Sequence, residues 1–134
     1  MLLTSGNTND CTQFIQVIAG IRMPRPQGRP WPRPRRVLAD KAYSTRAIRA
    51  YLRGRGIIAT IPERRDQQAN RRRRGRSGGR PPAFDSIAYR RRNVVERCFN
   101  RFKQWRGIAT RSDKKAVNYR GGIVLASVIL WLRT

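Results

Sequence analysis

The stretch Arg36–Pro62, RVLADKAYSTRAIRAYLRGRGIIATIP, decides the fold. Its first apolar run, residues 36–39, predicts a short buried strand that ends at Asp40. A helix through Arg53 follows, and the run at residues 56–62 predicts a second strand that stops at its proline. A strand, a helix and a strand in this order favour a right-handed crossover and a parallel strand pair.

The helix within this stretch has one apolar face. Ser44 or Thr45 is the expected N-cap, and Ile48 and Leu52 are expected to point inward. Its arginines are expected to point outward: Arg46, Arg49 and Arg53.

Strands and helices alternate along the rest of the chain, so the predicted class is α/β with one domain over residues 1–134. The other predicted segments are a strand stub at 1–4, a helix over 10–21 capped by Thr8 or Asn9, a Pro/Arg-rich linker over 24–35, a basic insertion without apolar periodicity over 63–83, a helix from Asp85 or Ser86 to Gly107, and an apolar helix over 118–132 that packs on the sheet.

Charge limits the choice of partner. The chain carries 31 basic and 7 acidic residues and a formal net charge of +24, which indicates nucleic acid. A membrane surface is the other polyanion, but no continuous basic amphipathic helix is present, and the apolar stretch 123–132 is too short to cross a bilayer. No signal peptide is apparent, and a reducing cytoplasm is the expected compartment.

The residue types limit the chemistry. The chain has no histidine and only two cysteines, far apart, which excludes classical zinc sites and histidine general bases. Any catalytic metal must bind carboxylates, which favours Mg²⁺ or Mn²⁺.

Four side chains are spaced to share one stripe of a single helix. At about 100° per residue, Tyr89, Arg92, Glu96 and Lys103 fall within roughly 60° of each other. Glu96 is then a lone carboxylate between two cations, a place to hold a metal ion beside a polyanion. Asp40, at the carboxyl end of a buried strand, is the second candidate ligand.

Each of these features has a simpler interpretation. Arg92 and Glu96 alone form an ordinary i,i+4 ion pair, and Asp40 alone suits a turn or a cap. The run Arg71, Arg72, Arg73 and Arg74 is typical of a solvated basic segment, although the total charge favours a DNA contact.

The four-residue spacing, Y-x2-R-x3-E-x6-K, resembles the signature of bacterial DDE-type insertion-sequence transposases of the four/five group. Further similar stretches are VLADKAY at residues 37–43, NVVER at 93–97, ATRSDK at 109–114 and GGRPP at 78–82. The resemblance implies a ribonuclease-H-like fold, with a mixed sheet and flanking helices. It also implies DNA strand cleavage and strand transfer with two Mg²⁺ ions. By position, Asp40 is the second catalytic acid and Glu96 the third, both as metal ligands, while Tyr89, Arg92 and Lys103 contact DNA near the transposon end.

One part of the family pattern is missing. The resemblance places residues 1–4 in the third strand, so the first strands and the first catalytic aspartate lack counterparts, and Asp10 is no substitute because it falls in a helix. The expectation is a truncated, frameshifted or split transposase, inactive alone and binding Mg²⁺ or Mn²⁺ weakly. Its expected partners are the transposon ends, target DNA, and an upstream transposase fragment or a second copy.

Three other functions remain open at this point. The chain could be a non-catalytic DNA-binding fragment, an RNA-binding protein of the ribosomal type, or the product of a pseudogene that never accumulates. Only the enzyme depends on Asp40 and Glu96.

Overall fold

The computed structural model describes residues 2–4, 8–110 and 113–132. The chain divides into two compact units. Residues 7–91 form the strand unit, which holds the sheet. Residues 92–134 together with 1–6 form the helical unit. Each is described by itself below.

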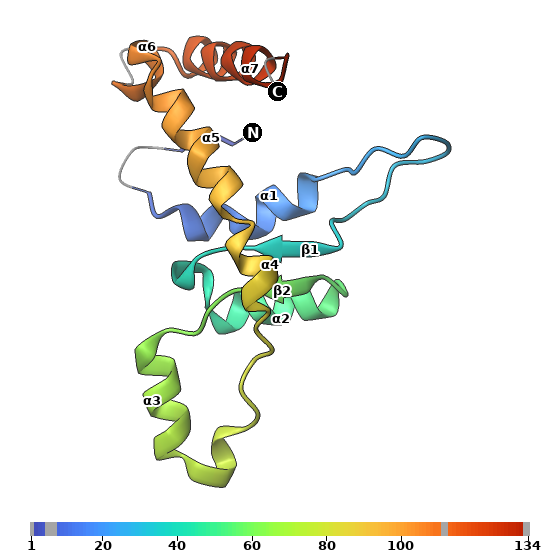
Figure 1. Ribbon diagram of the computed structural model, residues 1–134, viewed down its shortest axis with the longest axis vertical. Coiled ribbons are helices and arrows are strands. Elements are labelled where there is room, and N and C mark those ends of the chain that lie inside the picture. Colours follow the sequence, from blue (N-terminus) through green and yellow to red (C-terminus); the bar gives the residue numbers. More distant parts are fainter. Residues whose placement is uncertain (1, 5–7, 111–112, 133–134) are drawn as a thin grey trace. The chain divides into compact units, whose positions relative to one another are not determined.

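The sheet of the strand unit is a parallel pair, β1 (Arg36–Leu38) and β2 (Ile58–Thr60). In its register Val37 lies opposite Ala59. The helix α2 (Arg46–Gly54) connects the two strands (Figure 1). The strand–helix–strand prediction is therefore confirmed. The mixed sheet is not observed, because the described residues contain this two-stranded sheet alone.

Local capping explains where the helices of the strand unit begin. Thr45 caps α2, since its Oγ1 accepts a hydrogen bond from the Ile48 backbone N–H at 3.2 Å. Asn9 caps η1 (Asp10–Gln13) in the same way through Cys11, and the chain continues directly into α1 (Phe14–Gly20). Both predicted caps are confirmed.

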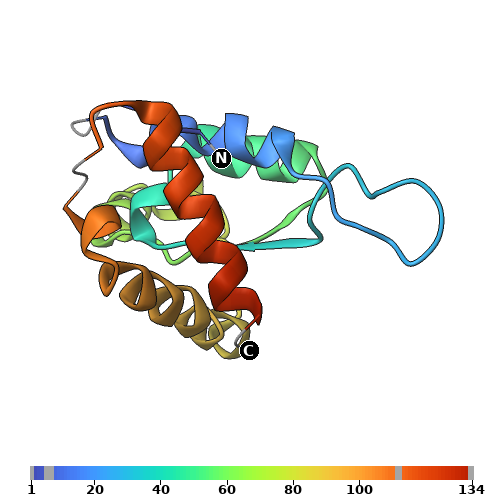
Figure 2. The same cartoon turned by 90° about the horizontal axis from the view of Figure 1, so that it is seen from above.

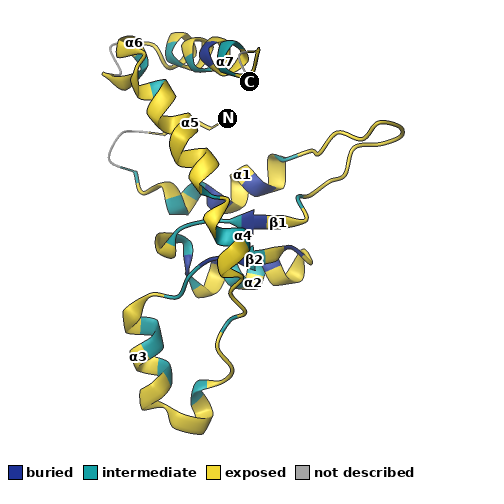
Figure 3. Ribbon diagram, viewed as in Figure 1, coloured by how far each residue is buried: buried dark blue, intermediate teal, exposed yellow. Residues whose placement is uncertain are grey.

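The apolar core lies in the strand unit. It joins α1, the two strands and α2, each of which carries buried segments in Figure 3. Leu52 is fully buried, and Ile61 is 1 % exposed. The core residues are Phe14, Ile18, Val37, Ile48, Leu52, Ile57 and Ile61.

The Pro/Arg-rich linker forms a long excursion between α1 and β1, visible in both Figure 1 and Figure 2. A single antiparallel bridge, Met23 with Trp31, closes its base through two 2.9 Å backbone hydrogen bonds. Trp31 is 47 % exposed and lies under Arg25, whose Cζ is 4.6 Å from the ring centroid. Prolines prevent this segment from continuing as a helix or an inner strand.

The basic insertion, which has no apolar periodicity, is nevertheless partly helical. It contains α3 (Arg65–Arg73) and η3 (Gly75–Gly78). The helix begins with Asp66 in its first turn and ends with arginines in its last turn, which suits the helix dipole. No residue of α3 is buried, so apolar packing does not stabilise this helix. The charged residues at its two ends do.

The predicted helix from residue 85 to residue 107 is divided. Asp85 caps α4 (Ser86–Arg90), and α5 (Asn93–Lys103) and α6 (Arg106–Ala109) follow as separate helices. At the first break the backbone bonds tighten, with Arg91 N–H donating to Ala88 and Val95 N–H to Arg92. Three consecutive arginines, residues 90–92, lie at this break. The helical period of the apolar residues does not reveal it.

The apolar helix α7 (Ala116–Leu132) forms as predicted but is largely exposed. Trp131 is 75 % exposed, and Ala126 is its one buried residue among those described. The large apolar side chains of α5 are mostly exposed too, with Phe99 at 61 %. Apolar composition determined that these helices form but did not determine what covers them.

Two sequence predictions fall partly outside the described residues. Met1 and the pair Arg111–Ser112 are not described, and residues 2–4 form no strand, so the predicted strand stub is wrong where it can be observed. None of the described helices has both the length and the apolar character needed to span a membrane. The two cysteines are free thiols: Cys11 is half-buried in the strand unit, and Cys98 is exposed on α5.

Candidate active site and nucleic-acid interface

Asp40 lies two residues beyond β1, at the carboxyl end of the strand. It caps η2 (Lys41–Tyr43), where its Oδ1 accepts a hydrogen bond from the Ala42 N–H at 2.8 Å. The cap role considered above is therefore real. Among the described residues no hydrogen bond uses Oδ2, and the side chain is half-buried. One carboxylate oxygen is thus fixed by the backbone while the other remains available to a ligand.

Tyr43 lies beside this carboxylate. Its ring packs on Phe14, with centroids 5.4 Å apart, which ties η2 to the core. Burial raises the pKa of the Tyr43 hydroxyl, and the negative charges of Asp10 and Asp40 raise it further. The phenol stays neutral at physiological pH, so it adds no charge that would compete with the carboxylates.

Glu96 lies in the first turn of α5 and is exposed. Its Oε1 accepts a hydrogen bond from Arg92 Nη2 in an i,i+4 ion pair. The pair orients the carboxylate. Its exposed setting limits its contribution to folding to a few tenths of a kcal/mol.

The structure corrects the prediction that four side chains lie along one stripe of a single helix. Tyr89 lies on α4, where its ring meets Phe84 at 5.2 Å, whereas Arg92 precedes α5 and Glu96 and Lys103 lie on it. The turn between α4 and α5 interrupts the helical period. Arg92, Glu96 and Lys103 still share one face of a helix, because their spacings of four and seven residues are spanned by a continuous backbone in αR conformation.

The four arginines of the predicted DNA-binding run, at the end of α3 and its cap, differ in burial. Arg71 is partly buried and forms an ion pair with Glu63, whereas Arg72, Arg73 and Arg74 are exposed. Arg73 donates to Asn70 at 3.0 Å. One helix therefore presents these four charges in different directions.

The α2 arginines were expected only to point outward, and for Arg49 that prediction is wrong. Arg49 is half-buried, and its guanidinium donates to Ser44 Oγ and to the Ile61 carbonyl, both at 2.8 Å. Arg46 and Arg53 flank it on the same helix face. Their spacing of three and four residues was the signal that could have identified a binding surface.

The donor chemistry fits a hard divalent ion without defining a complete site. Asp40 and Glu96 each retain an oxygen that no hydrogen bond between described residues uses. Carboxylate oxygens are the ligands that Mg²⁺ and Mn²⁺ prefer. Nowhere in the described part of the chain do three or more acidic or sulfur ligands gather.

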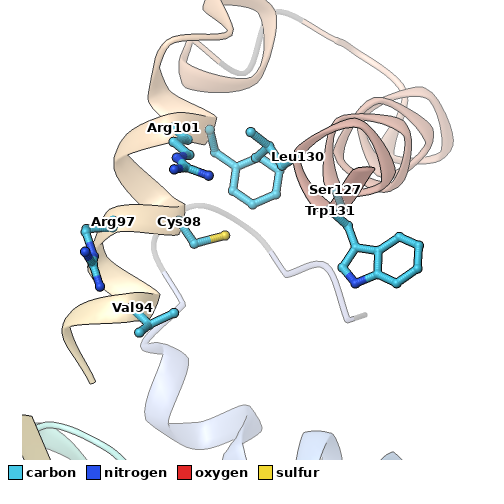
Figure 4. A pocket seen from close by; sticks show the side chains of 8 residues that line it. Val94, Arg97, Cys98, Arg101, Ser127, Leu130 and Trp131 are labelled. Atoms are coloured by element: carbon cyan, nitrogen blue, oxygen red, sulfur yellow. The ribbon is translucent and has the colours of Figure 1, made fainter. Parts of the chain in front are cut away.

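The helical unit has a separate groove beside α5 and α7, with a volume of about 530 Å³. Figure 4 shows Val94 and Cys98 projecting from α5 and Leu130 from α7. Glu96 does not line it, since it lies about 200° around the helix from Val94. The face that carries Glu96 is therefore distinct from the face that lines this groove.

Comparison with known proteins identifies the family. The Transposase DDE domain matches residues 1–131. The chain belongs to this family. A putative transposase for insertion sequence element IS6501 from Brucella ovis is 27% identical over 134 residues, covering 97% of this chain and 85% of that protein. A putative transposase for insertion sequence element IS402 from Burkholderia cepacia is 40% identical over 70 residues, which is 52% of this chain and 33% of that protein. No solved structure matches.

Family membership confirms the resemblance drawn from the transposase signature. Both acids singled out in this DDE transposase-family chain, Asp40 and Glu96, fall within the matched residues. The strand unit, an α/β arrangement with a two-stranded parallel sheet, is compatible with part of a ribonuclease-H-like domain.

Proposed function

We propose that this chain takes part in DNA transposition, by metal-dependent strand cleavage and strand transfer, as a member of the four/five group of insertion sequences. The match of the DDE transposase domain to residues 1–131 is the observation that carries the proposal. In this role Asp40 and Glu96 are the catalytic carboxylates that bind Mg²⁺ or Mn²⁺. The substrates are the transposon ends and the target DNA.

The chemistry follows from the residues in their observed settings. A divalent ion supplies the positive charge that activates the attacking oxygen and stabilises the leaving oxygen. Asp40 would hold such an ion through the oxygen that its cap leaves available, and Arg92 would keep the Glu96 carboxylate in position. Tyr89 and Lys103 contact the DNA backbone near the scissile phosphate.

A polypeptide of these 134 residues should be inactive by itself. The family's first aspartate has no matching position in this sequence, and two carboxylates bind divalent ions more weakly than three. Activity therefore depends on a further carboxylate, supplied by an upstream transposase segment or by a second copy. A DNA duplex bearing the matching element end, incubated with this chain and Mg²⁺ or Mn²⁺, should remain uncut. Metal-dependent cleavage that Glu96→Gln abolishes would refute this expectation.

Ion binding tests the two carboxylates directly. Titration of Mn²⁺, followed by its paramagnetic resonance signal, should show weak binding that Asp40→Asn and Glu96→Gln each reduce. Asp66→Asn is the matched control, because Asp66 is an exposed acid that pairs with Arg64. Equal losses in all three variants would mean that Mn²⁺ responds only to total charge, and the assignment of Asp40 and Glu96 would fail.

The net charge of +24 favours a second function, non-catalytic DNA binding. Both functions predict affinity that falls steeply with salt. They differ at the acids, since only the enzymatic role requires Asp40 and Glu96.

A further inference from the structure

A cavity of about 570 Å³ lies in the strand unit beside α2 and α3, and Asp40 does not line it. Six arginines line it, against the single acid Glu63. We call it the arginine groove, and its arginines are Arg46, Arg49, Arg53, Arg71, Arg74 and Arg80. Three come from α2, two from the end of α3 and its cap, and one from the chain that leads back toward α4 (Figure 1).

The floor of the groove is a fixed polar network. Ser44 is 1 % exposed, and its hydroxyl donates to Gln67 Oε1 at 2.8 Å while accepting from Arg49. Gln67 Nε2 donates back to the Ser44 carbonyl. Burial lowers the pKa of Arg49, and the charge of Glu63 opposes that shift, so the guanidinium stays protonated at neutral pH. This network holds α3 on the start of α2.

The rim of the groove holds cations that have no partner among the described residues. Within that part of the chain, no hydrogen bond or ion pair uses the guanidinium of Arg46, Arg53, Arg74 or Arg80. Four like charges around one cavity repel one another unless an anion enters. Each guanidinium presents the planar donors that suit phosphate oxygens.

The groove continues into a neighbouring cavity of about 530 Å³. The two cavities share Arg49, Arg53 and Arg80. The second also contains Phe84 and the ion pair of Arg36 with Asp85, so its uncompensated charge comes from the shared arginines. A row of cations across two adjoining cavities suits an extended polyanion better than a single phosphate ion.

We propose that the arginine groove binds the DNA phosphate backbone without regard to sequence and without a divalent ion. The proposal rests on the proposed function only in taking DNA as the polyanion. Of the four arginines at residues 71–74, the proposal assigns DNA binding in the groove to two. Arg71 and Arg74 line the groove, whereas Arg72 and Arg73 do not. The proposal also gives Glu63 a role. This carboxylate already pairs with Arg71 inside the groove, so an incoming phosphate must compete with it.

The test measures the affinity of the full chain for a short DNA duplex of arbitrary sequence, by fluorescence anisotropy at several salt concentrations in the presence of EDTA. Arg53→Gln with Arg74→Gln should weaken binding about tenfold or more at physiological salt. The slope of log affinity against log salt should fall by about 0.9 for each phosphate that the variant no longer binds. Arg72→Gln with Arg76→Gln removes the same charge from exposed positions outside the groove, and should have a much smaller effect.

A third variant is expected to change affinity in the opposite direction. Glu63→Gln removes the competing charge while its amide oxygen can still accept from Arg71, so DNA affinity should rise several-fold. Because a misfolded variant would lose affinity rather than gain it, this result separates the groove from a folding defect.

Three results would overturn the proposal. These are equal losses in the two double variants, no gain in Glu63→Gln, or tighter binding of an RNA duplex of the same sequence that depends on the same arginines. EDTA makes the outcome independent of metal chemistry. The proposal for the groove can therefore be refuted while the roles of Asp40 and Glu96 stand, and those roles can be refuted while the groove proposal stands.

Discussion

Asp85 joins two segments that are far apart in sequence. Its Oδ1 caps α4 by accepting from Ala88 N–H at 2.9 Å, and its Oδ2 forms an ion pair with Arg36 of β1 at 2.6 Å. The Ala88 hydrogen bond and the Arg36 partner lower the pKa of the carboxyl below its ordinary value of 3.8. Sequence alone predicted the cap, because capping is local. It could not predict the pairing with Arg36, which is 49 residues away.

A lowered pKa gives this residue a defined pH dependence. A carboxyl that is more acidic in the folded state stabilises the fold above pH 3.8, and that contribution is lost as the pH falls through the folded pKa. Thermal melts followed by circular dichroism should show a lower Tm for Asp85→Asn at neutral pH. Asparagine keeps the cap, so the variant removes mainly the charge and its pairing with Arg36. The Tm gap to the unmodified chain should close below pH 3.8, and a gap that stays constant with pH would contradict the assignment.

Among the elements, α7 shows best what local sequence determines. Its helical state was predicted and is confirmed, whereas its burial was predicted and is wrong. A helix depends on propensities and caps that its own residues carry. Burial depends on which surface packs against it, and no local pattern encodes that surface. The break between α4 and α5 escaped prediction for a related reason, because the apolar period continues across Arg91 and Arg92 although the helix does not.

Two glycines inside α7 make its stability testable. A Cβ at Gly121 or Gly122 would meet nothing within 4 Å, and alanine is favoured over glycine in helix interiors by about 1 kcal/mol. Gly121→Ala should therefore increase helical circular dichroism at 222 nm and raise the resistance of α7 to urea.

Gly78→Ala is the opposite control for this change. A Cβ at Gly78 would lie 2.3 Å from the backbone oxygen of Arg71, so the turn that follows α3 would have to shift. The same substitution should be destabilising there. Similar effects at both glycines would show that the packing described for them is wrong.

At the scale of the whole molecule, the apolar core and the positive charge are distributed differently. The buried apolar cluster lies in the strand unit, while basic residues occur in both units, from Arg22 onward. The composition contains the net charge and indicated nucleic acid as the partner. The motif spacing predicted the family. The division into two units was not predicted, because the expected single core would have joined both.

Hydrogen exchange should reveal this division. Amides of β1, β2 and α2 surround Leu52 and Ile61, so they should exchange most slowly. Amides of α3 and α5, which bury no residue, should exchange within the first time points. Mass spectrometry of peptides from a deuterium pulse would measure both, and protection of α5 equal to that of α2 would contradict the described core.

The two free thiols allow the distance between the two units to be measured. Cys11 belongs to the strand unit with Asp40, and Cys98 lies two residues from Glu96 in the helical unit. Because Cys98 is exposed and Cys11 half-buried, different dyes can be attached in sequence, Cys98 first. Energy transfer between the dyes would then report, without any engineered cysteine, whether manganese and DNA draw the two acids together.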